Sequence, residues 1–361
     1  MTDINSNNKK ALIAMSGGVD SSVAAKIIND ASFECIGCTM KLYDNDDTVL
    51  SKDNTCCSLD DVEDARQVAA NLKMPYYVFN FKDGFKEHVI DSFVKAYESG
   101  KTPNPCILCN RYMKFEKLYQ RARELGCYYV VTGHYARIEY DGNRYLLKKA
   151  IDKSKDQSYV LYSMTQEQLK HTLFPLGELE KTKVREIAME NGFVNSNKPD
   201  SQDICFVPDG DYASFLERYT GKKYEEGHFI DCAGNVLGTH KGIVRYTVGQ
   251  RKGLGISYNE PIYVKDLDVE KNTVVLARDS ELYSDRLIAN DINLISVDKI
   301  DKPMEVTAKI RYRHTEAKAT VTQISEDEIE VVFKEPQRAI TKGQAVVLYK
   351  GDIVVGGGTI C

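Results

Sequence analysis

The chain has 361 residues, 42% hydrophobic and 28% charged, with a formal net charge of −5. This length exceeds what one hydrophobic core usually supports, so two or three domains are expected, and the acidic total argues against an overall attraction to nucleic acid. Neither a signal peptide nor an apolar run of roughly 20 residues is present, so we expect a cytoplasmic protein without membrane contact.

The first half of the chain alternates apolar strands with amphipathic helices. Strands are expected over 10–16, 33–43, 75–81 and 128–137, and helices over 20–30, 58–73, 85–100 and 111–126. Strands separated by helices of this length form βαβ units, which predicts a parallel sheet with helices on both faces. The pattern continues to about Cys205.

From about residue 210 the pattern changes to segments punctuated by glycine and rich in β-branched residues. Alternating runs over 304–313, 319–325, 328–333 and 344–358 then predict antiparallel strands of a C-terminal β-barrel. We expect a nucleotide-binding catalytic domain over 1–208, a small middle domain over 209–283 and the barrel over 284–361.

A phosphate-binding loop is predicted in ALIAMSGGVDSSVAA, residues 11–25. A strand that runs into Gly17 and Gly18 and then into a helix near Asp20 exposes backbone N–H groups to an anion. Ser16, Ser21 and Ser22 can add hydroxyls, and Asp20 is placed to hold Mg²⁺. The GxxxxGK[ST] spacing of a Walker loop is missing. A plain glycine turn is the alternative, but the complete SGGxDS resembles the PP-loop ATP pyrophosphatases, which implies transfer of AMP to a substrate oxygen.

Two cysteine segments suggest thiol chemistry. TPNPCILCNRYMKF holds Cys106 and Cys109 in a CxxC, and KPDSQDICFVPDG holds Cys205. In a reducing compartment the ten cysteines are expected to be thiols, metal ligands or catalysts. A CxxC alone leaves a zinc knuckle, a redox pair, a cluster ligand set and a nucleophile all open.

The motifs SGGVDSS, TPNPCILCN, TGHYAR, KDQSY, SQDICF, GQRKGLGI and KIRYR occur in this order. Over nearly the whole chain they resemble the tRNA-uridine 2-sulfurtransferases, which make 2-thiouridine at the wobble position, 34. The resemblance implies ATP and Mg²⁺ as cofactors. It implies adenylation of the uracil 2-oxygen and sulfur transfer from a protein-bound persulfide. Its expected partners are tRNAs such as those for Glu, Gln and Lys, and a sulfur donor, either a cysteine desulfurase or a relay protein.

The resemblance also implies roles for individual residues. Cys109 corresponds to the catalytic nucleophile and Cys205 to the persulfide carrier. The ATP site would be lined by Ala14, Met15, Ser16, Gly17, Gly18, Val19, Asp20, Ser21, Met40 and Gly133. The tRNA-contacting positions would be Lys155, Asp156, Gln157, Arg311 and Tyr312.

One residue departs from the commoner family pattern. Cys106 stands where an Asp is usually placed as a general base, and a thiol with a pKa near 8.5 does not replace a carboxyl with one near 4. The alternative is that Cys106, Cys109 and Cys205 hold a four-iron iron–sulfur cluster with one iron open to sulfur. The sequence leaves the cluster and a Cys109–Cys205 disulfide cycle equally open.

Local basic segments provide candidates for tRNA contact. Residues 232–259 contain no Asp or Glu but do contain Lys241, Arg245, Arg251 and Lys252 beside Tyr246. In KIRYRHTEAK, strand alternation would place Arg311 and Arg313 on one face, and Tyr312 is a candidate for stacking on a flipped base.

Other residues have less specific interpretations. Cys35 and Cys38 would point to opposite faces of a strand, which makes chelation unlikely. Cys56 and Cys57 are expected to lie in a loop without function, and the alternative is a metal or sulfur-relay site. His134, at a strand's carboxyl end, either supports the ATP loop or contacts substrate.

Two rival functions are considered. An amidating ligase would use the same loop with ammonia as nucleophile, but it needs neither the three cysteines nor a basic β domain. A non-catalytic, metal-stabilised RNA-binding module would not turn ATP over to AMP. Measured AMP release therefore excludes the second rival.

Overall fold

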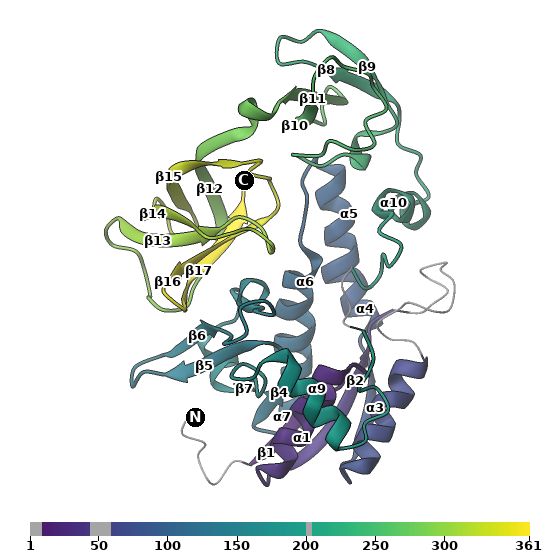
Figure 1. The fold of residues 1–361 in the computed structure, drawn as a ribbon, viewed down its shortest axis with the longest axis vertical. Helices are drawn as coiled ribbons and strands as arrows, with labels where there is room; N and C mark the ends of the chain where they lie inside the picture. The colour runs from purple at the N-terminus through teal and green to yellow at the C-terminus, as the bar shows by residue number, and fades with distance from the viewer. Residues whose placement is uncertain (1–8, 44–58, 200–203) are drawn as a thin grey trace. The chain divides into compact units, whose positions relative to one another are not determined.

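The computed structural model describes residues 9–43, 59–199 and 204–361. They form two compact units (Figure 1). The first takes the chain up to 89, 106–210 and 352–355, and the second takes 90–105, 211–351 and 356–361. Cys56 and Cys57 lie outside the described residues.

A parallel sheet forms the centre of the first unit. Its strands are β1 (Lys10–Ala14), β2 (Glu34–Lys41), β3 (Tyr76–Asn80), β4 (Tyr129–Val131) and β7 (Thr172–Leu173). Their order is β3-β2-β1-β4-β7, and every neighbouring pair is parallel. The expected α/β fold is confirmed.

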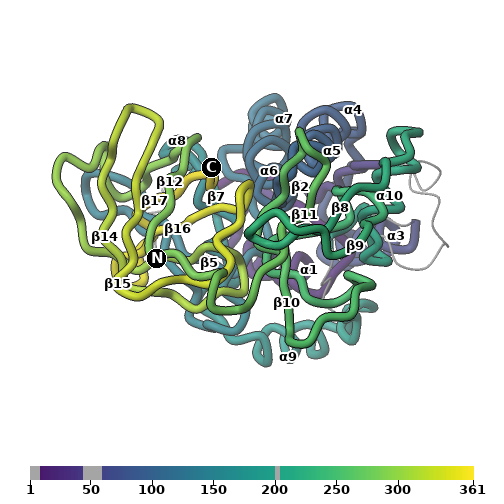
Figure 2. Tube along the Cα trace, turned by 90° about the horizontal axis from the view of Figure 1, so that it is seen from above, coloured from purple at the N-terminus to yellow at the C-terminus, as the bar shows by residue number. Residues whose placement is uncertain are grey.

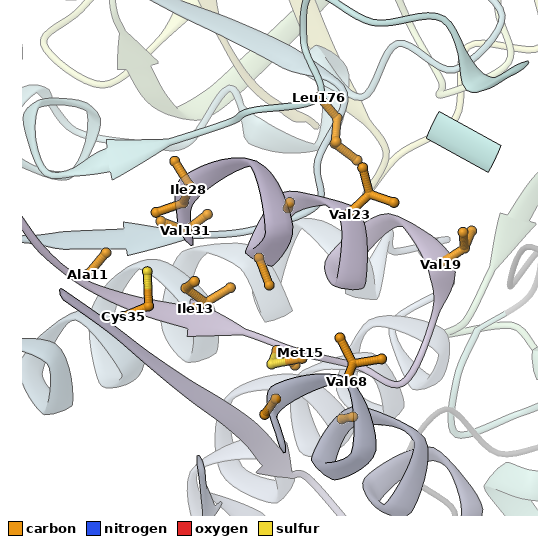
Figure 3. Close-up of a cluster of buried hydrophobic side chains, with 14 of the residues drawn as sticks. Ala11, Ile13, Met15, Val19, Val23, Ile28, Cys35, Val68, Val131 and Leu176 are labelled. Carbon is orange, nitrogen blue, oxygen red and sulfur yellow. The ribbon is translucent and has the colours of Figure 1, made fainter. Parts of the chain in front are cut away.

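Helices cover both faces of this sheet. On one face, α1 (Val19–Asp30), α3 (Leu59–Asn71) and α9 (Lys181–Glu190) pack in a layer where Met15 lies beside Val68 (Figure 3). On the other face, α7 (Leu118–Glu124) packs against Leu12 and Val130. Cys35 belongs to the first layer and Cys38 to the second, which confirms that they point to opposite faces.

The expected strand over 128–137 divides into two elements. Its first part is β4, whereas β5 (Ala136–Tyr140) turns away and pairs antiparallel with β6 (Tyr145–Lys149). Short elements follow: η3 (Ser158–Leu161) and α8 (Gln166–Lys170). The residues between β4 and β5 are therefore a loop at the carboxyl end of a central strand.

Two long helical runs contain π-helical turns. One consists of α4 (Lys82–Phe85), η1 (Lys86–Ile90) and α5 (Asp91–Glu98), and the other of α6 (Pro105–Leu108), η2 (Cys109–Lys117) and α7. Both η1 and η2 are π-helices. This conformation is rare in proteins overall, but where it occurs it is often at a functional site.

The second unit is mainly β structure. It contains α10 (Tyr212–Thr220), η4 (Ile243–Arg245), η5 (Asp279–Leu282) and a sheet of order β10-β11-β8-β9. These strands are β8 (Gly227–Ile230), β9 (Val236–His240), β10 (Ile262–Asp268) and β11 (Thr273–Arg278).

The C-terminal strands close into a ring, seen from a second side in Figure 2. They are β12 (Tyr283–Leu294), β13 (Met304–Lys309), β14 (Ala317–Gln323), β15 (Ile329–Arg338), β16 (Ala345–Lys350) and β17 (Ile353–Ile360). The order is β12-β15-β14-β13-β16-β17, and β12 also pairs with β17. The predicted antiparallel barrel is confirmed. No helix in the described ranges has the length and apolar character needed to cross a membrane.

Candidate active site

The order of the parallel strands identifies where a ligand can bind. The chain builds outward from β1 through β2 to β3 and then returns to place β4 on the other side of β1. Open α/β sheets bind ligands at the carboxyl ends of strands where the order reverses. Here that position holds the loop after β1, residues 15–18, and the loop after β4, residues 132–135.

The loop after β1 has the backbone conformation of a tight phosphate-type turn. Gly17 has φ +73°, and a Cβ there would lie 2.3 Å from the carbonyl oxygen of Asp61. Ser21 Oγ donates to Gly18 O at 3.0 Å and accepts from the backbone N–H of Ser16 at 3.1 Å. The Ser21 hydroxyl, expected to contact a phosphate, therefore shapes the loop.

Gly133 brings the second loop against the first. A Cβ at this position would lie 2.8 Å from both the carbonyl carbon of Asp20 and the amide nitrogen of Ser21. Only glycine permits this approach to the start of α1. Gly133 thus lies beside the phosphate loop, and its contact with ATP stays a prediction.

Asp20 is held by two residues that the sequence analysis did not select. Lys181 Nζ donates to Asp20 Oδ1 at 2.7 Å and to Oδ2 at 2.8 Å. The Tyr135 hydroxyl donates to Oδ1 at 2.8 Å. Lys181 and Tyr135 are buried, with 8% and 3% of their surface exposed. A buried ammonium needs a charge partner, and the Asp20 carboxylate provides it.

A second cation, Lys198, contacts the loop itself. Lys198 Nζ donates to Asp61 Oδ1 at 2.6 Å and to Asp64 Oδ2 at 2.8 Å, and it lies 3.4 Å from Gly17 O. Burial lowers the pKa of Lys198, but hydrogen bonds to the two carboxylates outweigh it, and the pKa is raised. The amide of Asn195 donates to Gly17 O at 2.9 Å. These contacts hold the backbone of the loop at Gly17.

His134 is a buried residue beside the site. Its Nδ1 lies 2.6 Å from Thr132 Oγ1, and its Nε2 lies 3.4 Å from Lys114 Nζ. Burial, and secondarily the Lys114 charge, lower the pKa of His134 well below its usual value. Of the two roles considered, these contacts favour structural support.

Cys106 and Cys109 lie on one helical run. Cys106 is in α6 and exposed, whereas Cys109 begins η2 and is half-buried. The next residue, Asn110, is buried and donates from Nδ2 to the carbonyl of Val160 at 3.0 Å, while its Oδ1 has no partner among the described residues. This contact joins η2 to η3.

Phe206, the neighbour of Cys205, and Met113 of η2 both lie against the same short helix, α4. The carbonyl of Cys205 accepts a hydrogen bond from the Tyr43 hydroxyl at 2.8 Å, and Phe206 meets Phe85 of α4 at a ring-centroid distance of 5.8 Å. A Cβ on Gly84 of α4 would lie 3.5 Å from Met113 of η2. The structure therefore brings the two thiol-bearing segments, far apart in sequence, onto one element.

The three thiols were the candidate ligands of a cluster. In the parts of the chain that are described, no three His, Cys, Asp or Glu side chains are gathered to hold a metal ion. The iron–sulfur cluster on Cys106, Cys109 and Cys205 therefore stays a prediction. For Mg²⁺ the donor chemistry fits, because Asp20 supplies hard carboxylate oxygens at the phosphate loop.

Residues 155–157, the segment of the first unit that is expected to contact tRNA, form hydrogen bonds within the protein. Asp156 Oδ1 accepts from the backbone N–H of Ala150 at 3.0 Å, and its Oδ2 accepts from Ser158 Oγ at 2.8 Å. Gln157 Oε1 accepts from the backbone N–H of Tyr135 at 3.0 Å. These side chains therefore hold the loop, and direct tRNA contact by Lys155, Asp156 and Gln157 stays a prediction.

In the second unit only part of the expected basic surface is exposed. Arg245 is paired with Glu217 at 2.6 Å and Tyr246 is buried, whereas Arg251 and Lys252 are exposed.

The expected strand position of Arg311 and Arg313 is wrong. β13 ends at Lys309, and Arg311 lies in a turn closed by the backbone N–H of His314 at 3.0 Å. Tyr312 is 37% exposed, with Lys309 Nζ 5.9 Å from its ring centroid.

Sequence reasoning thus missed Lys181, Lys198 and Asn195. Each is far along the chain from the phosphate loop. Lys181 and Asn195 stand in no pattern that distinguishes them from surface polar residues, whereas Lys198 begins the quoted segment KPDSQDICFVPDG. Tyr135 had a signal, because it belongs to the quoted TGHYAR motif.

Comparisons with known proteins agree with this architecture. Residues 9–209 match the family model described as tRNA methyl transferase HUP domain. Residues 213–278 match the tRNA methyl transferase PRC-barrel domain, and 284–360 match the aminomethyltransferase beta-barrel domain.

Curated relatives match the chain from end to end. The tRNA-specific 2-thiouridylase MnmA of Clostridioides difficile (strain 630) is 55% identical over 355 residues, covering 98% of each chain. The protein of the same name from Lachnoclostridium phytofermentans is 52% identical, covering 98% of this chain and 99% of that one. A solved 4-thiouridine synthetase–RNA complex with bound ATP has a TM-score of 0.38 and 20% identity, covering 59% of this chain and 50% of that chain. By its full-length identity to the curated relatives, this chain belongs to the tRNA-specific 2-thiouridylase family.

Proposed function

We propose that the protein uses ATP to replace the 2-oxygen of the wobble uridine of tRNA by sulfur. Relatives more than half identical to the whole chain bear the name tRNA-specific 2-thiouridylase. The observation that carries the proposal is that one unit holds the phosphate loop, with Asp20 fixed at its end, and both segments that bear Cys109 and Cys205.

The first step is adenylation of the uracil 2-oxygen. This oxygen attacks the α-phosphorus of ATP, pyrophosphate leaves, and the oxygen becomes part of an AMP leaving group. Backbone N–H groups at Gly17 and Gly18 and the N-terminus of α1 would bind phosphate oxygens, with Lys181 adding a cation. Mg²⁺, held by Asp20, would neutralise phosphate charge.

The second step is sulfur transfer. The terminal sulfur of a Cys205 persulfide attacks C2 of the adenylated uracil, and AMP leaves with the original oxygen. Cys109 then attacks the Cys205 sulfur, which releases 2-thiouridine and forms a Cys109–Cys205 disulfide that two electrons from a reductant must reopen. The common packing of both thiol segments on α4 supports this pairing.

The partners follow from the chemistry. The substrate would be tRNAs with a wobble uridine, such as those for Glu, Gln and Lys. A cysteine desulfurase or relay protein would load Cys205 with sulfur, and the site of action would be the cytoplasm, where tRNA is found. A cluster on Cys106, Cys109 and Cys205 receives no support from the arrangement of these residues.

The matching family model is described as a methyl transferase domain, so methylation is the competing activity to separate. Unmodified tRNA is incubated with ATP, Mg²⁺, a persulfide source and reductant, and the nucleosides are analysed by mass spectrometry. We expect 2-thiouridine at the wobble position together with equimolar AMP. Formation of ADP, or a methylated nucleoside that requires S-adenosylmethionine, would contradict the proposal. An AMP-forming reaction with ammonia instead of sulfur would indicate an amidating ligase.

A further inference from the structure

The loop over residues 150–158 is attached to both residues that hold Asp20. Gln157 exchanges two hydrogen bonds with the backbone of Tyr135: its Oε1 accepts at 3.0 Å and its N–H donates at 2.8 Å. Asp152 Oδ2 accepts from the backbone N–H of Lys181 at 3.1 Å. The loop is therefore connected to the Asp20 carboxylate twice, once through Tyr135 and once through Lys181.

Internal hydrogen bonds make this loop a unit. Asp152 Oδ1 accepts from Ser154 N–H at 3.0 Å and from Ser154 Oγ at 2.6 Å. Asp156 joins the two ends of the loop by accepting from Ala150 and Ser158. A loop with these closures shifts as a whole when one part of it is displaced.

Tyr135 and Lys181, to which the loop is hydrogen-bonded, are packed in the interior. Because Tyr135 and Lys181 are buried, a shift of their backbones cannot be absorbed by solvent and must be followed by their side chains. Both side chains end on the Asp20 carboxylate. Lys153 and Ser154, by contrast, are exposed on the loop and accessible to a polyanion.

We propose that the 150–158 loop couples tRNA binding to the phosphate loop, with Tyr135 and Asp152 as positioning residues. The inference rests on the proposed function, in which tRNA engages this loop and ATP engages Asp20. A tRNA backbone that fixes the loop also fixes Tyr135 and Lys181, and so orders Asp20 for the nucleotide. The coupling is reciprocal, so nucleotide binding tightens tRNA binding by the same factor.

The experiment measures the dissociation constant of the non-cleavable analogue α,β-methylene-ATP with Mg²⁺, without and with saturating unmodified tRNA. For the wild type we expect tRNA to tighten analogue binding at least about five-fold, the lower end of typical allosteric factors. Tyr135→Phe, which removes only the hydroxyl, and Asp152→Ala should each reduce this factor below about two-fold. Their tRNA affinity without nucleotide should stay within about two-fold of wild type.

Two further variants keep the result interpretable. Tyr129→Phe makes the same change at another buried tyrosine of this unit, one that packs on Phe33 and Tyr128, and should retain the full factor. Asp152→Asn is included in case Asp152→Ala folds poorly. It keeps an acceptor for the Lys181 N–H, so it should recover part of the factor by which tRNA tightens analogue binding.

The inference would be overturned if tRNA left the analogue affinity of the wild type unchanged, or if folded Tyr135→Phe and Asp152→Ala proteins both kept the full factor. Measuring 2-thiouridine formation by the same wild-type preparation distinguishes failure of this inference from failure of the proposed function. If thiolation occurs without coupling, only this inference fails. If no thiolation occurs, the proposed function fails and the inference fails with it.

Discussion

Lys181 and Asp20 form a two-pronged salt bridge across 161 positions of the chain, with Lys181 Nζ 2.7 Å and 2.8 Å from the two carboxylate oxygens. The helix that begins at Lys181 thereby fixes the acidic residue at the start of α1. An ATP triphosphate would offer Lys181 a second anionic partner. We expect Lys181 to share its charge with phosphate oxygens while an Asp20 oxygen turns to Mg²⁺.

The first prediction concerns Lys181→Met. Because the variant loses the cation at the phosphate loop, we expect the dissociation constant for ATP to rise at least about ten-fold, equivalent to about 1.4 kcal/mol. Binding of tRNA should be unchanged. Lys183→Met is the matched control, since Lys183 lies on the same helix but is exposed and paired with Glu186. Equal ATP affinity in both variants would contradict the assignment.

The second prediction concerns Asp20→Ala. AMP formation should fall below detection, because the variant removes the carboxylate that would hold Mg²⁺. It also removes the Asp20 carboxylate from the buried Lys181 ammonium. We expect the free energy of unfolding to drop by less than the roughly 3–5 kcal/mol of a fully buried pair, because Asp20 is partly exposed.

Asp30→Ala provides the control on the same helix. Its exposed pair with Lys26 should contribute less than about 1 kcal/mol. AMP release and urea unfolding are measured on both variants. Substantial AMP turnover by a folded Asp20→Ala protein would exclude this phosphate site.

The local signals in the sequence predicted much of this fold. An apolar strand, two glycines and an amphipathic helix are local signals, and they predict the turn from β1 to α1. The Asp20 network could not be predicted in the same way. It depends on how α9 packs beside α1, and no local pattern records which lysine that packing buries.

At Arg311 the error is of a different kind, because a local pattern predicted a strand that is too long. The alternation in KIRYR continues past the point where strand pairing stops, so a period of two predicts a longer strand. The register pairs Ala308 with Ala317, and the residues between them must turn. Strand ends are decided by the partner strand, which the alternation of one segment does not reveal.

The third prediction concerns tRNA affinity. The double variant Arg251→Ala/Lys252→Ala and the single variant Arg311→Ala should each weaken binding, with a smaller slope of log K against log salt, because each phosphate contact releases counterions. ATP affinity should be nearly unchanged. Lys299→Ala, a surface lysine paired with Asp301, is the control. Parallel losses of ATP and tRNA affinity would indicate misfolding.

The fourth prediction concerns acid stability. The pKa of His134 is lowered in the folded protein, so below the unfolded value of about 6.5 the unfolded state binds a proton that the folded state does not. Stability from this group is present above that pH and is lost as pH falls, by up to about 1.4 kcal/mol per unit.

His134→Asn removes this titration. Its unfolding free energy should decline less between pH 7 and pH 5 than that of the wild type, as measured by urea denaturation. Equal declines would show that His134 is accessible to protons in the folded state.

The last prediction concerns the three thiols. Cys109→Ala and Cys205→Ala should each eliminate 2-thiouridine formation, because either change removes one partner of the sulfur-releasing disulfide. Cys106→Ala should keep much of the activity, since Cys106 is exposed and not gathered with the other two into a metal site. Cys106→Asp, which restores the commoner family residue, should keep or raise it. Cys361→Ala, at an exposed thiol, is the control.

Metal analysis of the same proteins, purified without oxygen, separates this scheme from a cluster. We expect wild-type protein without iron or sulfide that is fully active with a reductant. In that case activity should follow the redox state of Cys109 and Cys205, because only their disulfide must be reopened in each cycle. The disulfide cycle would be excluded if the wild-type protein were brown and the Cys106→Ala protein had lost both the iron and the activity, because Cys106 is not required in that cycle.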